Sequence, residues 1–236
     1  MYAAISTSIA RSNMFSTARN ATPTVFIVDD DISVRESLEP LIARAGWRPE
    51  VFATAQEFLA RPHVPQPGCL VLDLSLPDLD GLELQRRIAD RTNLPIIFIT
   101  GHGDIPSSVR AMKAGAVEFL TKPFGPEVLL SAVRVAIERS RASLHDEADL
   151  QTLRARYGSL TGREQQVMAL VVLGQMNKHV AAELGIGEVT VKAHRGRMMR
   201  KMNARSLAEL VNMAARLGHA TAGEWGRDAL ASTGVL

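Results

Sequence analysis

Residues 69–81 read CLVLDLSLPDLDG, and this stretch decides the fold. It begins with an unbroken apolar run and then reaches a carboxylate, Asp73. A run that is short and apolar on both faces is typical of a central strand, buried on both sides, in a parallel sheet. Pro77 and Gly81 then turn the chain into a loop. Because ligands of open α/β sheets bind at the carboxyl ends of the strands, Asp73 marks a candidate site.

Strand-like and helix-like segments alternate on both sides of this stretch. Further strands are predicted at 24–28, 50–53, 95–99 and 116–120. Apolar residues at helical spacing predict helices around 34–42, 58–59, 82–90, 105–114 and 127–141. Strict alternation of strands and helices predicts an α/β fold with a five-stranded, doubly wound parallel sheet and right-handed crossovers.

The predicted strand ends carry residues that suit one kind of chemistry. Asp29 and Asp30 follow the first strand, Asp73 ends the third, and Thr100 and Lys122 follow the fourth and fifth. Carboxylates that meet at one sheet edge repel each other unless a cation holds them, and all-oxygen ligands suit Mg²⁺ or Mn²⁺. Such a cation would neutralise a phosphoryl group and align it with a carboxylate nucleophile. Thr100 and Lys122 could donate hydrogen bonds to the phosphoryl oxygens.

Plainer interpretations stay open for these residues. An Asp at a strand end is often a turn former or the cap of the next helix, which would leave Asp73 without chemistry. Lys122 could form a simple salt bridge with Asp73, and that pairing is compatible with a phosphoryl site. Phe119 lies in a strand pattern, so its position alone indicates a core residue.

The charge of the chain divides it into two unlike parts. The net charge is +2, but residues 21–125 hold 10 basic and 14 acidic residues, whereas residues 157–220 hold nine and four. An acidic part followed by a basic part suggests two domains with different partners. The single cysteine cannot form an intrachain disulfide, and no apolar stretch approaches the roughly 20 residues of a membrane span. We therefore expect a cytoplasmic protein without a membrane partner.

The basic part carries a helix-turn-helix pattern. Residues 177–185, NKHVAAELG, predict a short helix that a Gly-containing turn joins to a second, basic helix at 188–202. A helix that starts after Thr161 and an amphipathic helix at 206–218 complete a small all-α domain. A basic helix can also be a solvated face, but the turn spacing and the charge balance favour binding to DNA.

The motifs VDDD, LDLSLPDLDG, ITGHGD and FLTKPF together resemble the receiver domain of two-component response regulators, over about residues 23–140. The resemblance implies a flavodoxin-like receiver fold, a partner histidine kinase and Asp73 as the phospho-acceptor. It also implies a Mg²⁺ or Mn²⁺ ion and a cis bond between Lys122 and Pro123. The implied residue roles are a metal site of Asp29 (mainly through water), Asp30, Asp73 and the Ser75 carbonyl, a switch pair of Thr100 and Phe119, and a phosphoryl contact from Lys122.

The segments LTGRE, NK and VTVKAHRGRMMRKM resemble the LuxR-type helix-turn-helix of the NarL/FixJ regulators, over about residues 157–219. The domain order, with GHGDIP in the receiver, resembles the FixJ subgroup most. The resemblance implies that 188–202 is the recognition helix and that a homodimer binds a two-fold site on double-stranded DNA. The DNA contacts that it implies are Lys192, Ala193 and Gly196 in the groove, Asn177, Lys178, Thr190, His194 and Arg195 nearer the backbone, and Lys201 on the same basic helix.

These observations predict a domain order and a function. The predicted order is a disordered leader at 1–22, a receiver at 23–140, a partly helical linker at 141–156, a helix-turn-helix domain at 157–219 and a flexible tail at 220–236. We expect a regulator that a sensor histidine kinase phosphorylates on Asp73 and that then dimerises, binds DNA and activates transcription, with RNA polymerase as a further candidate partner. It would be no enzyme beyond its own phosphorylation and dephosphorylation.

Two alternative functions stay open. In the first, the chain regulates transcription without phosphorylation and uses the receiver only to dimerise. In the second, a phosphatase-like enzyme forms a covalent intermediate on Asp73 during turnover of a substrate, with Asp78 or Asp80 as its general acid.

Overall fold

The computed structural model describes residues 21–220 except 63, 92 and 102–104. Nearly all of the predicted leader and of the predicted tail lies outside the described residues. The chain divides into two compact units, Met1–Glu147 and Ala148–Leu236, and each is described by itself. Within the described ranges, the helices are too short or too polar to cross a membrane.

The first unit is built on one parallel sheet. Its strands are β1 (Thr24–Val28), β2 (Arg48–Phe52), β3 (Gly68–Asp73), β4 (Ile96–Thr100) and β5 (Glu118–Thr121). They lie in the order β2-β1-β3-β4-β5, and every neighbouring pair is parallel. This is the flavodoxin-like order, in which the direction of winding reverses between β1 and β3. The predicted fold class is therefore confirmed, and the predicted central strand is β3.

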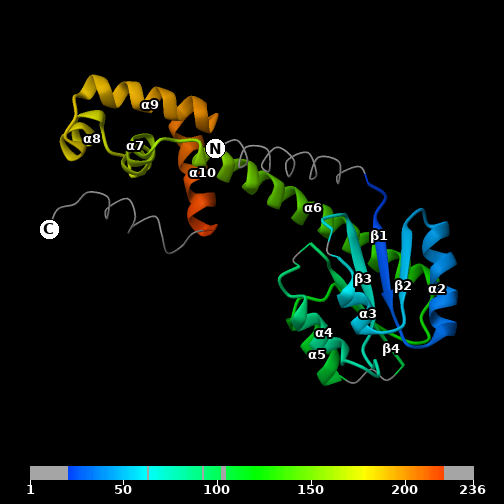
Figure 1. The fold of residues 1–236 in the computed structure, drawn as a ribbon. Coiled ribbons are helices and arrows are strands. Elements are labelled where there is room, and N and C mark those ends of the chain that lie inside the picture. The colour runs from blue at the N-terminus through cyan, green and yellow to red at the C-terminus, as the bar shows by residue number, and fades with distance from the viewer. Residues whose placement is uncertain (1–20, 63, 92, 102–104, 221–236) are drawn as a thin grey trace. The chain divides into compact units, whose positions relative to one another are not determined.

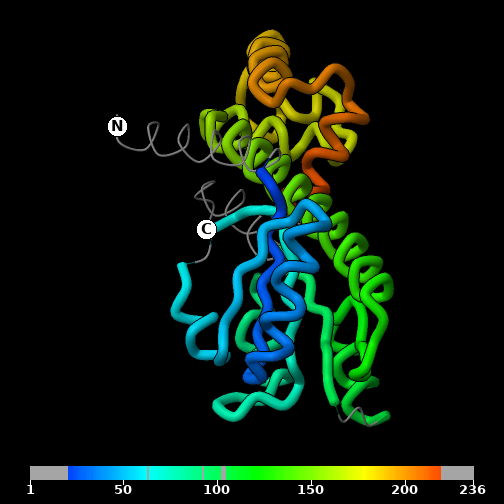
Figure 2. The backbone as a smooth tube through the Cα atoms, turned by 90° about the vertical axis from the view of Figure 1, so that its right-hand side faces the viewer, coloured from blue at the N-terminus to red at the C-terminus, as the bar shows by residue number. Residues whose placement is uncertain are grey.

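Helices cover both faces of this sheet (Figures 1 and 2). One face packs against α2 (Ile32–Arg44) and the first turns of α6 (Pro126–Gly158), and the other against α3 (Ala55–Ala60), α4 (Gly81–Arg87) and α5 (Ile105–Lys113). Successive strand residues alternate between the two faces, so Val25 and Ile27 join one core and Phe26 and Val28 join the other. Burial on both faces explains why the inner strands are apolar throughout.

Helix α6 is longer than the sequence pattern predicts. It runs from Pro126 to Gly158 without interruption, so the predicted linker at 141–156 is helical throughout. The segment before Gly158 lacks Gly and Pro, which are the residues that most often end a helix. Near the middle of α6, the hydroxyl of Ser140 donates to the carbonyl of Asn93 at 2.5 Å and accepts the N–H of Gly68 at 3.1 Å. Ser140 thereby fixes α6 to the loops at the amino ends of β3 and β4.

The second unit is all-helical beyond the end of α6. Its helices are α7 (Gly162–Val172), α8 (Asn177–Leu184), α9 (Glu188–Met202) and α10 (Leu207–Ala220). Thr161 caps α7 in a reciprocal capping box with Glu164. Gly185 ends α8 in the left-handed conformation, with φ of 63°, which makes the tight turn into α9. Buried side chains that hold the four helices together include Val167, Met168, Val171, Val180, Val191, Met198, Met202 and Leu210.

The start of α4 leaves no room for a side chain at Gly81. A Cβ at this position would lie 2.7 Å from the carbonyl oxygen of Asp73 and 3.1 Å from the ring of Phe98. Gly81→Ala should therefore lower the free energy of unfolding by about 1–3 kcal/mol, because β3 or the loop must shift. Urea denaturation followed by far-UV circular dichroism measures the change.

Gly125→Ala is the matched control in the same unit. Its Cβ would meet nothing closer than a methyl of Val128 at 4.0 Å, so only the loss of a glycine at the start of α6 remains, and the expected change is below about 1 kcal/mol. Equal stabilities of the two variants would contradict the steric argument.

Candidate functional site

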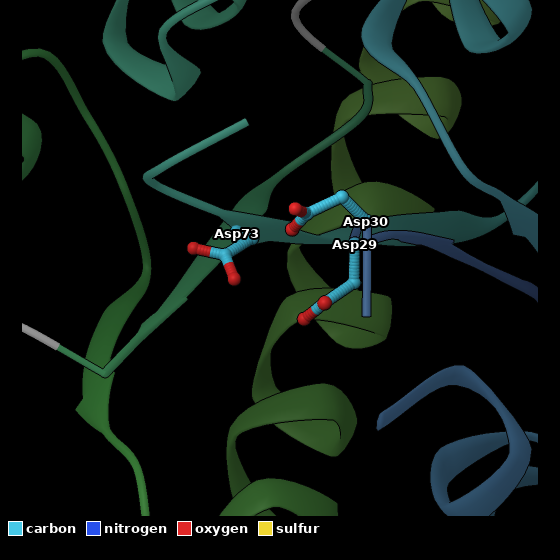
Figure 3. Close-up of side chains that lie close together, drawn as sticks. All are labelled: Asp29, Asp30 and Asp73. Atoms are coloured by element: carbon cyan, nitrogen blue, oxygen red, sulfur yellow. The ribbon is translucent and has the colours of Figure 1, made fainter. Parts of the chain in front are cut away.

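Three carboxylates meet at the carboxyl edge of the sheet. Asp29 and Asp30 directly follow β1, and Asp73 ends the neighbouring strand β3. Figure 3 shows the three carboxyl groups side by side where their strands end, and one oxygen of each lies within 4.8 Å of the others. Asp29 is fully buried and Asp73 is 6% exposed, whereas Asp30 faces solvent. The three acids therefore meet at one edge of the sheet, as the sequence predicts.

Lys122 bridges two of these carboxylates. Its Nζ atom lies 2.7 Å from an oxygen of Asp29 and 2.7 Å from an oxygen of Asp73. The backbone N–H of Lys122 donates to the carbonyl of Thr100 at 2.7 Å, and the bond to Pro123 is cis, as the resemblance implies. The predicted salt bridge between Lys122 and Asp73 is therefore present, and Lys122 forms a second salt bridge with Asp29.

The electrostatics of the bridge follow from burial and pairing. Burial is the largest effect on Asp29 and raises the pKa of its carboxyl, although Lys122 acts in the opposite direction. Burial would lower the pKa of Lys122, but its hydrogen bonds to Asp29 and Asp73 outweigh that effect and raise the pKa. Lys122 therefore stays charged, and one ammonium faces three carboxylates. The excess of negative charge fits a divalent cation.

The carboxylates are also fixed from the protein side. An oxygen of Asp73 accepts the N–H of Ser75 at 2.9 Å, and an oxygen of Asp29 accepts the N–H of Asp31 at 3.0 Å. These bonds orient the acids without neutralising them. A hard cation such as Mg²⁺ prefers oxygen ligands of this kind, so the residues present fit the ion that the sequence predicts.

Sequence reasoning missed Arg35 beside the acidic pair. One guanidinium nitrogen of Arg35 donates to the backbone carbonyls of Asp29 at 2.6 Å and Asp30 at 2.9 Å. Arg35 lies in the first turn of α2, four residues after its N-cap Asp31, so the helix brings the side chain back over the end of β1. An arginine four residues after the N-cap is the sequence signal that could have indicated this contact.

The two predicted switch residues lie on neighbouring strands. Thr100 is buried at the end of β4, and β4 pairs with both β3 and β5. Phe119 of β5 is half-buried, with its ring centroid 6.3 Å from that of Phe98. Phe119 thus packs against the core next to the strand that carries Thr100, and its role as a switch stays a prediction.

The loop after Asp73 uses its other acids as helix caps. The carboxylate of Asp78 accepts the N–H groups of Ala55 at 3.3 Å and Gln56 at 3.0 Å, at the start of α3. Asp80 accepts the N–H of Leu82 at 2.8 Å and caps α4. Both acids thus have structural partners, which weakens the phosphatase alternative because that alternative needs one of them as a general acid.

Helix α9 presents a basic outward face. Its core side carries Val191, Met198 and Met202. Among the predicted DNA contacts, the exposed residues are Lys178, Thr190, Lys192, Ala193 and Gly196, and the half-buried ones are Asn177, His194 and Arg195. The guanidinium of Arg195 donates to the side-chain oxygen of Asn177 at 3.1 Å, which joins α9 to the start of α8.

Lys201, which the resemblance assigns to DNA binding, has partners inside the domain. Its ammonium donates to the carboxylate of Glu164 at 2.6 Å and to the carbonyl of Ser159 at 3.1 Å. Glu164 is 2% exposed and also accepts the N–H of Thr161. Burial would raise the pKa of Glu164, but the bonds from Lys201 and Thr161 outweigh burial and lower the pKa. Lys201 therefore fastens α9 to the start of α7.

The chain is similar to known regulators along most of its length. The family described as "Response regulator receiver domain" matches residues 25–134, and "Bacterial regulatory proteins, luxR family" matches residues 158–214. Nodulation protein W of Bradyrhizobium diazoefficiens is 50% identical over 195 residues, which cover 82% of this chain and 86% of that protein. Transcriptional regulatory protein FixJ of Rhizobium meliloti is 45% identical over 192 residues, 81% of this chain and 94% of that protein. The structure of the response regulator StyR has 49% sequence identity and a TM-score of 0.73, and the match covers 83% of this chain and 100% of that chain.

Fold, site and similarity agree on the class of protein. A receiver sheet with an acidic edge, followed by a LuxR-type helix-turn-helix domain, defines a DNA-binding response regulator. The chain belongs to the response regulators of two-component systems, within the FixJ-like part of the NarL/FixJ family. The family predicted from the sequence motifs is thereby confirmed.

The acidic edge should bind Mg²⁺ tightly enough to stabilise the first unit. At a Mg²⁺ concentration 100 times the Kd, the expected gain in the free energy of unfolding is about 2.7 kcal/mol, because only the folded state binds the ion. Thermal unfolding with and without Mg²⁺ measures it. Asp30→Asn should abolish most of this gain, whereas Glu36→Gln, an exposed change on α2, should retain it. A gain that survives in Asp30→Asn would place the ion elsewhere.

Lys201→Met should destabilise the second unit by roughly 1–3 kcal/mol, because Glu164 would stay buried without its cation. This loss is smaller than that of a fully buried pair because about a third of the Lys201 side chain is exposed. Since the pKa of Glu164 is lowered, its contribution to stability is present above its ordinary pKa of 4.5 and is lost as the pH falls through the lowered pKa. Urea denaturation at a series of pH values measures both effects.

The control for this prediction is Lys192→Met. Lys192 is exposed and lies 3.5 Å from an oxygen of Glu188, so its removal should change stability by less than about 1 kcal/mol. If both variants lose the same stability and keep the same pH dependence, the anchoring role of Lys201 is wrong.

Proposed function

We propose that Asp73 accepts a phosphoryl group from a partner sensor histidine kinase and that this modification controls DNA binding and transcription. The observation that carries the proposal is the position of the Asp73 carboxylate, which is bridged by Lys122 beside Asp29 and Asp30. A nucleophilic carboxylate with a fixed cation on one side and a candidate metal site on the other suits phosphoryl transfer.

The proposed reaction needs few parts from the protein. One oxygen of Asp73 attacks phosphorus, the phosphorus–nitrogen bond of the kinase phosphohistidine breaks, and the imidazole leaves with the electron pair. Asp29, Asp30, Asp73 and the carbonyl of Ser75 would hold Mg²⁺, which when bound supplies positive charge for the phosphoryl oxygens. The receiver in this proposal catalyses its own phosphorylation and dephosphorylation and acts on no other substrate.

Lys122 can contact the phosphoryl group and still keep its salt bridge with Asp29. When the carboxylate of Asp73 becomes an acyl phosphate, the ammonium keeps its partner Asp29 at 2.7 Å and exchanges its other partner for a phosphoryl oxygen. Thr100, at the end of β4, would donate its hydroxyl to the same group, and Phe119 would respond on β5. A full inversion of two populations from 1:99 to 99:1 needs about 5.5 kcal/mol of differential stabilisation.

The output of the proposed switch is a homodimer on a two-fold DNA site. The second unit offers the basic outward face of α9 for DNA and exposed apolar residues on α10, Leu207 and Val211, for a second copy. We propose that the dimer acts in the cytoplasm, where it contacts double-stranded DNA and RNA polymerase, and that it activates transcription. The name of the relative FixJ describes a transcriptional regulator, which supports this output.

Intact mass spectrometry tests the acceptor directly. After incubation with a small acyl phosphate and Mg²⁺, the wild-type chain should gain one phosphoryl group and Asp73→Asn should gain none. Asp80→Asn is the matched control, because Asn also caps helices well and the loop should keep its shape. A wild-type chain without any adduct would favour the alternative in which the receiver only dimerises.

A further inference from the structure

Val189 is an apolar side chain in an unusual place. It is the second residue of α9 and is 81% exposed, the highest exposure of any large hydrophobic side chain in the described part of the chain. A single exposed apolar residue normally needs no explanation. Val189, however, lies at the start of the basic helix that the family uses for DNA.

The residues that share a face with Val189 are small. Ala193 follows four residues later and Gly196 seven residues later, so all three lie along one side of α9. All three are exposed, and a Cβ added to Gly196 would meet no described atom within 4 Å. The core residues Val191 and Met198 lie on another side. The unit itself therefore leaves this narrow apolar stripe uncovered.

Cations flank the stripe on both sides. Lys192 and Arg197 are exposed on its two sides, and Arg200 is exposed at its carboxyl-terminal end. Lys192 has one solvent-exposed pair with Glu188 at 3.5 Å. Such a surface suits an occupant with negative charge at its rims and an apolar feature at its centre. The DNA major groove has this arrangement, with phosphates on both edges and the C5 methyl group of thymine on its floor.

We propose that Val189 packs against the C5 methyl of a thymine in each half-site and thereby determines part of the DNA sequence that this chain recognises. Val189 has no donor or acceptor, so it can distinguish thymine from cytosine only through that methyl. The small side chains at Ala193 and Gly196 allow α9 to approach the bases closely enough for this contact. The inference rests on the proposed DNA-binding function.

The experiment starts from the full-length protein and its own preferred DNA. A binding site is selected in vitro from random duplexes, with and without a small acyl phosphate and Mg²⁺, so that the test does not depend on phosphorylation. Each thymine of the selected site is then replaced by deoxyuridine, which removes only the C5 methyl. When the contacted thymine of one half-site is replaced, binding should weaken by about fourfold, which is the value of one buried methyl.

The variant Val189→Ala completes a double-mutant cycle. It should bind the thymine site several-fold more weakly than the wild type does, and it should lose the penalty for deoxyuridine at that one position. Leu173→Ala, which removes a side chain that is 77% exposed outside α9, should keep the full penalty. Thermal unfolding of both variants should match the wild type, because neither side chain is buried.

The outcomes separate the inference from the function on which it rests. If the chain selects a DNA site but no thymine methyl matters, or if Val189→Ala keeps the same penalty, the contact is wrong and the stripe serves another partner such as a protein. If the full-length chain selects no DNA sequence under either condition, the proposed DNA-binding function fails, and this inference fails with it.

Discussion

The first unit depends on one interaction, in which the carboxylates of Asp29 and Asp73 share the ammonium of Lys122. Asp29 is fully buried and Asp73 is nearly so, and two such carboxylates side by side would repel each other strongly without a cation. Lys122 compensates them only in part, because Asp30 adds a third negative charge at the rim. The carboxyl edge of the sheet is thus stable enough to fold, and it still has an excess of negative charge. That residual negative charge is what suits the site to a divalent cation.

The second unit contains a similar ion pair with a different role, which is to hold two helices together. Lys201 and Glu164 form one short contact in which the carboxylate is buried and also accepts the N–H of Thr161. The one carboxylate that Lys201 contacts balances its charge, so this pair has no excess charge to offer a ligand. The Lys201–Glu164 pair therefore only holds α9 against the start of α7. The bridge at Lys122 leaves an excess of negative charge that can bind a cation. The number of carboxylates around each lysine makes the difference.

The sequence predicts this fold well where the signal is local. The apolar run before Asp73 and the acids and lysine at the strand ends indicate the sheet and its edge, because parallel strands bring their carboxyl ends together. The prediction misses distant partners that no shared sheet edge brings together, as with Lys201 and Glu164, which lie 37 residues apart. It also places β2 at 50–53 rather than Arg48–Phe52, because its residues are half-buried or exposed and give no clear apolar run. Helix propensity alone likewise could not decide how far α6 extends.

The contacts of α9 bear on how a phosphoryl group could regulate DNA binding. Its core side is buried, Arg195 joins it to Asn177, and Lys201 joins it to Glu164, so the helix is held at several points along its length. A helix fixed in this way holds its outward residues in one arrangement within the second unit. If phosphorylation of Asp73 drives dimerisation, as proposed above, it would bring two copies of this surface to the DNA together. Two linked copies would bind two half-sites more tightly than separate copies would, because the second contact then forms at a high effective concentration.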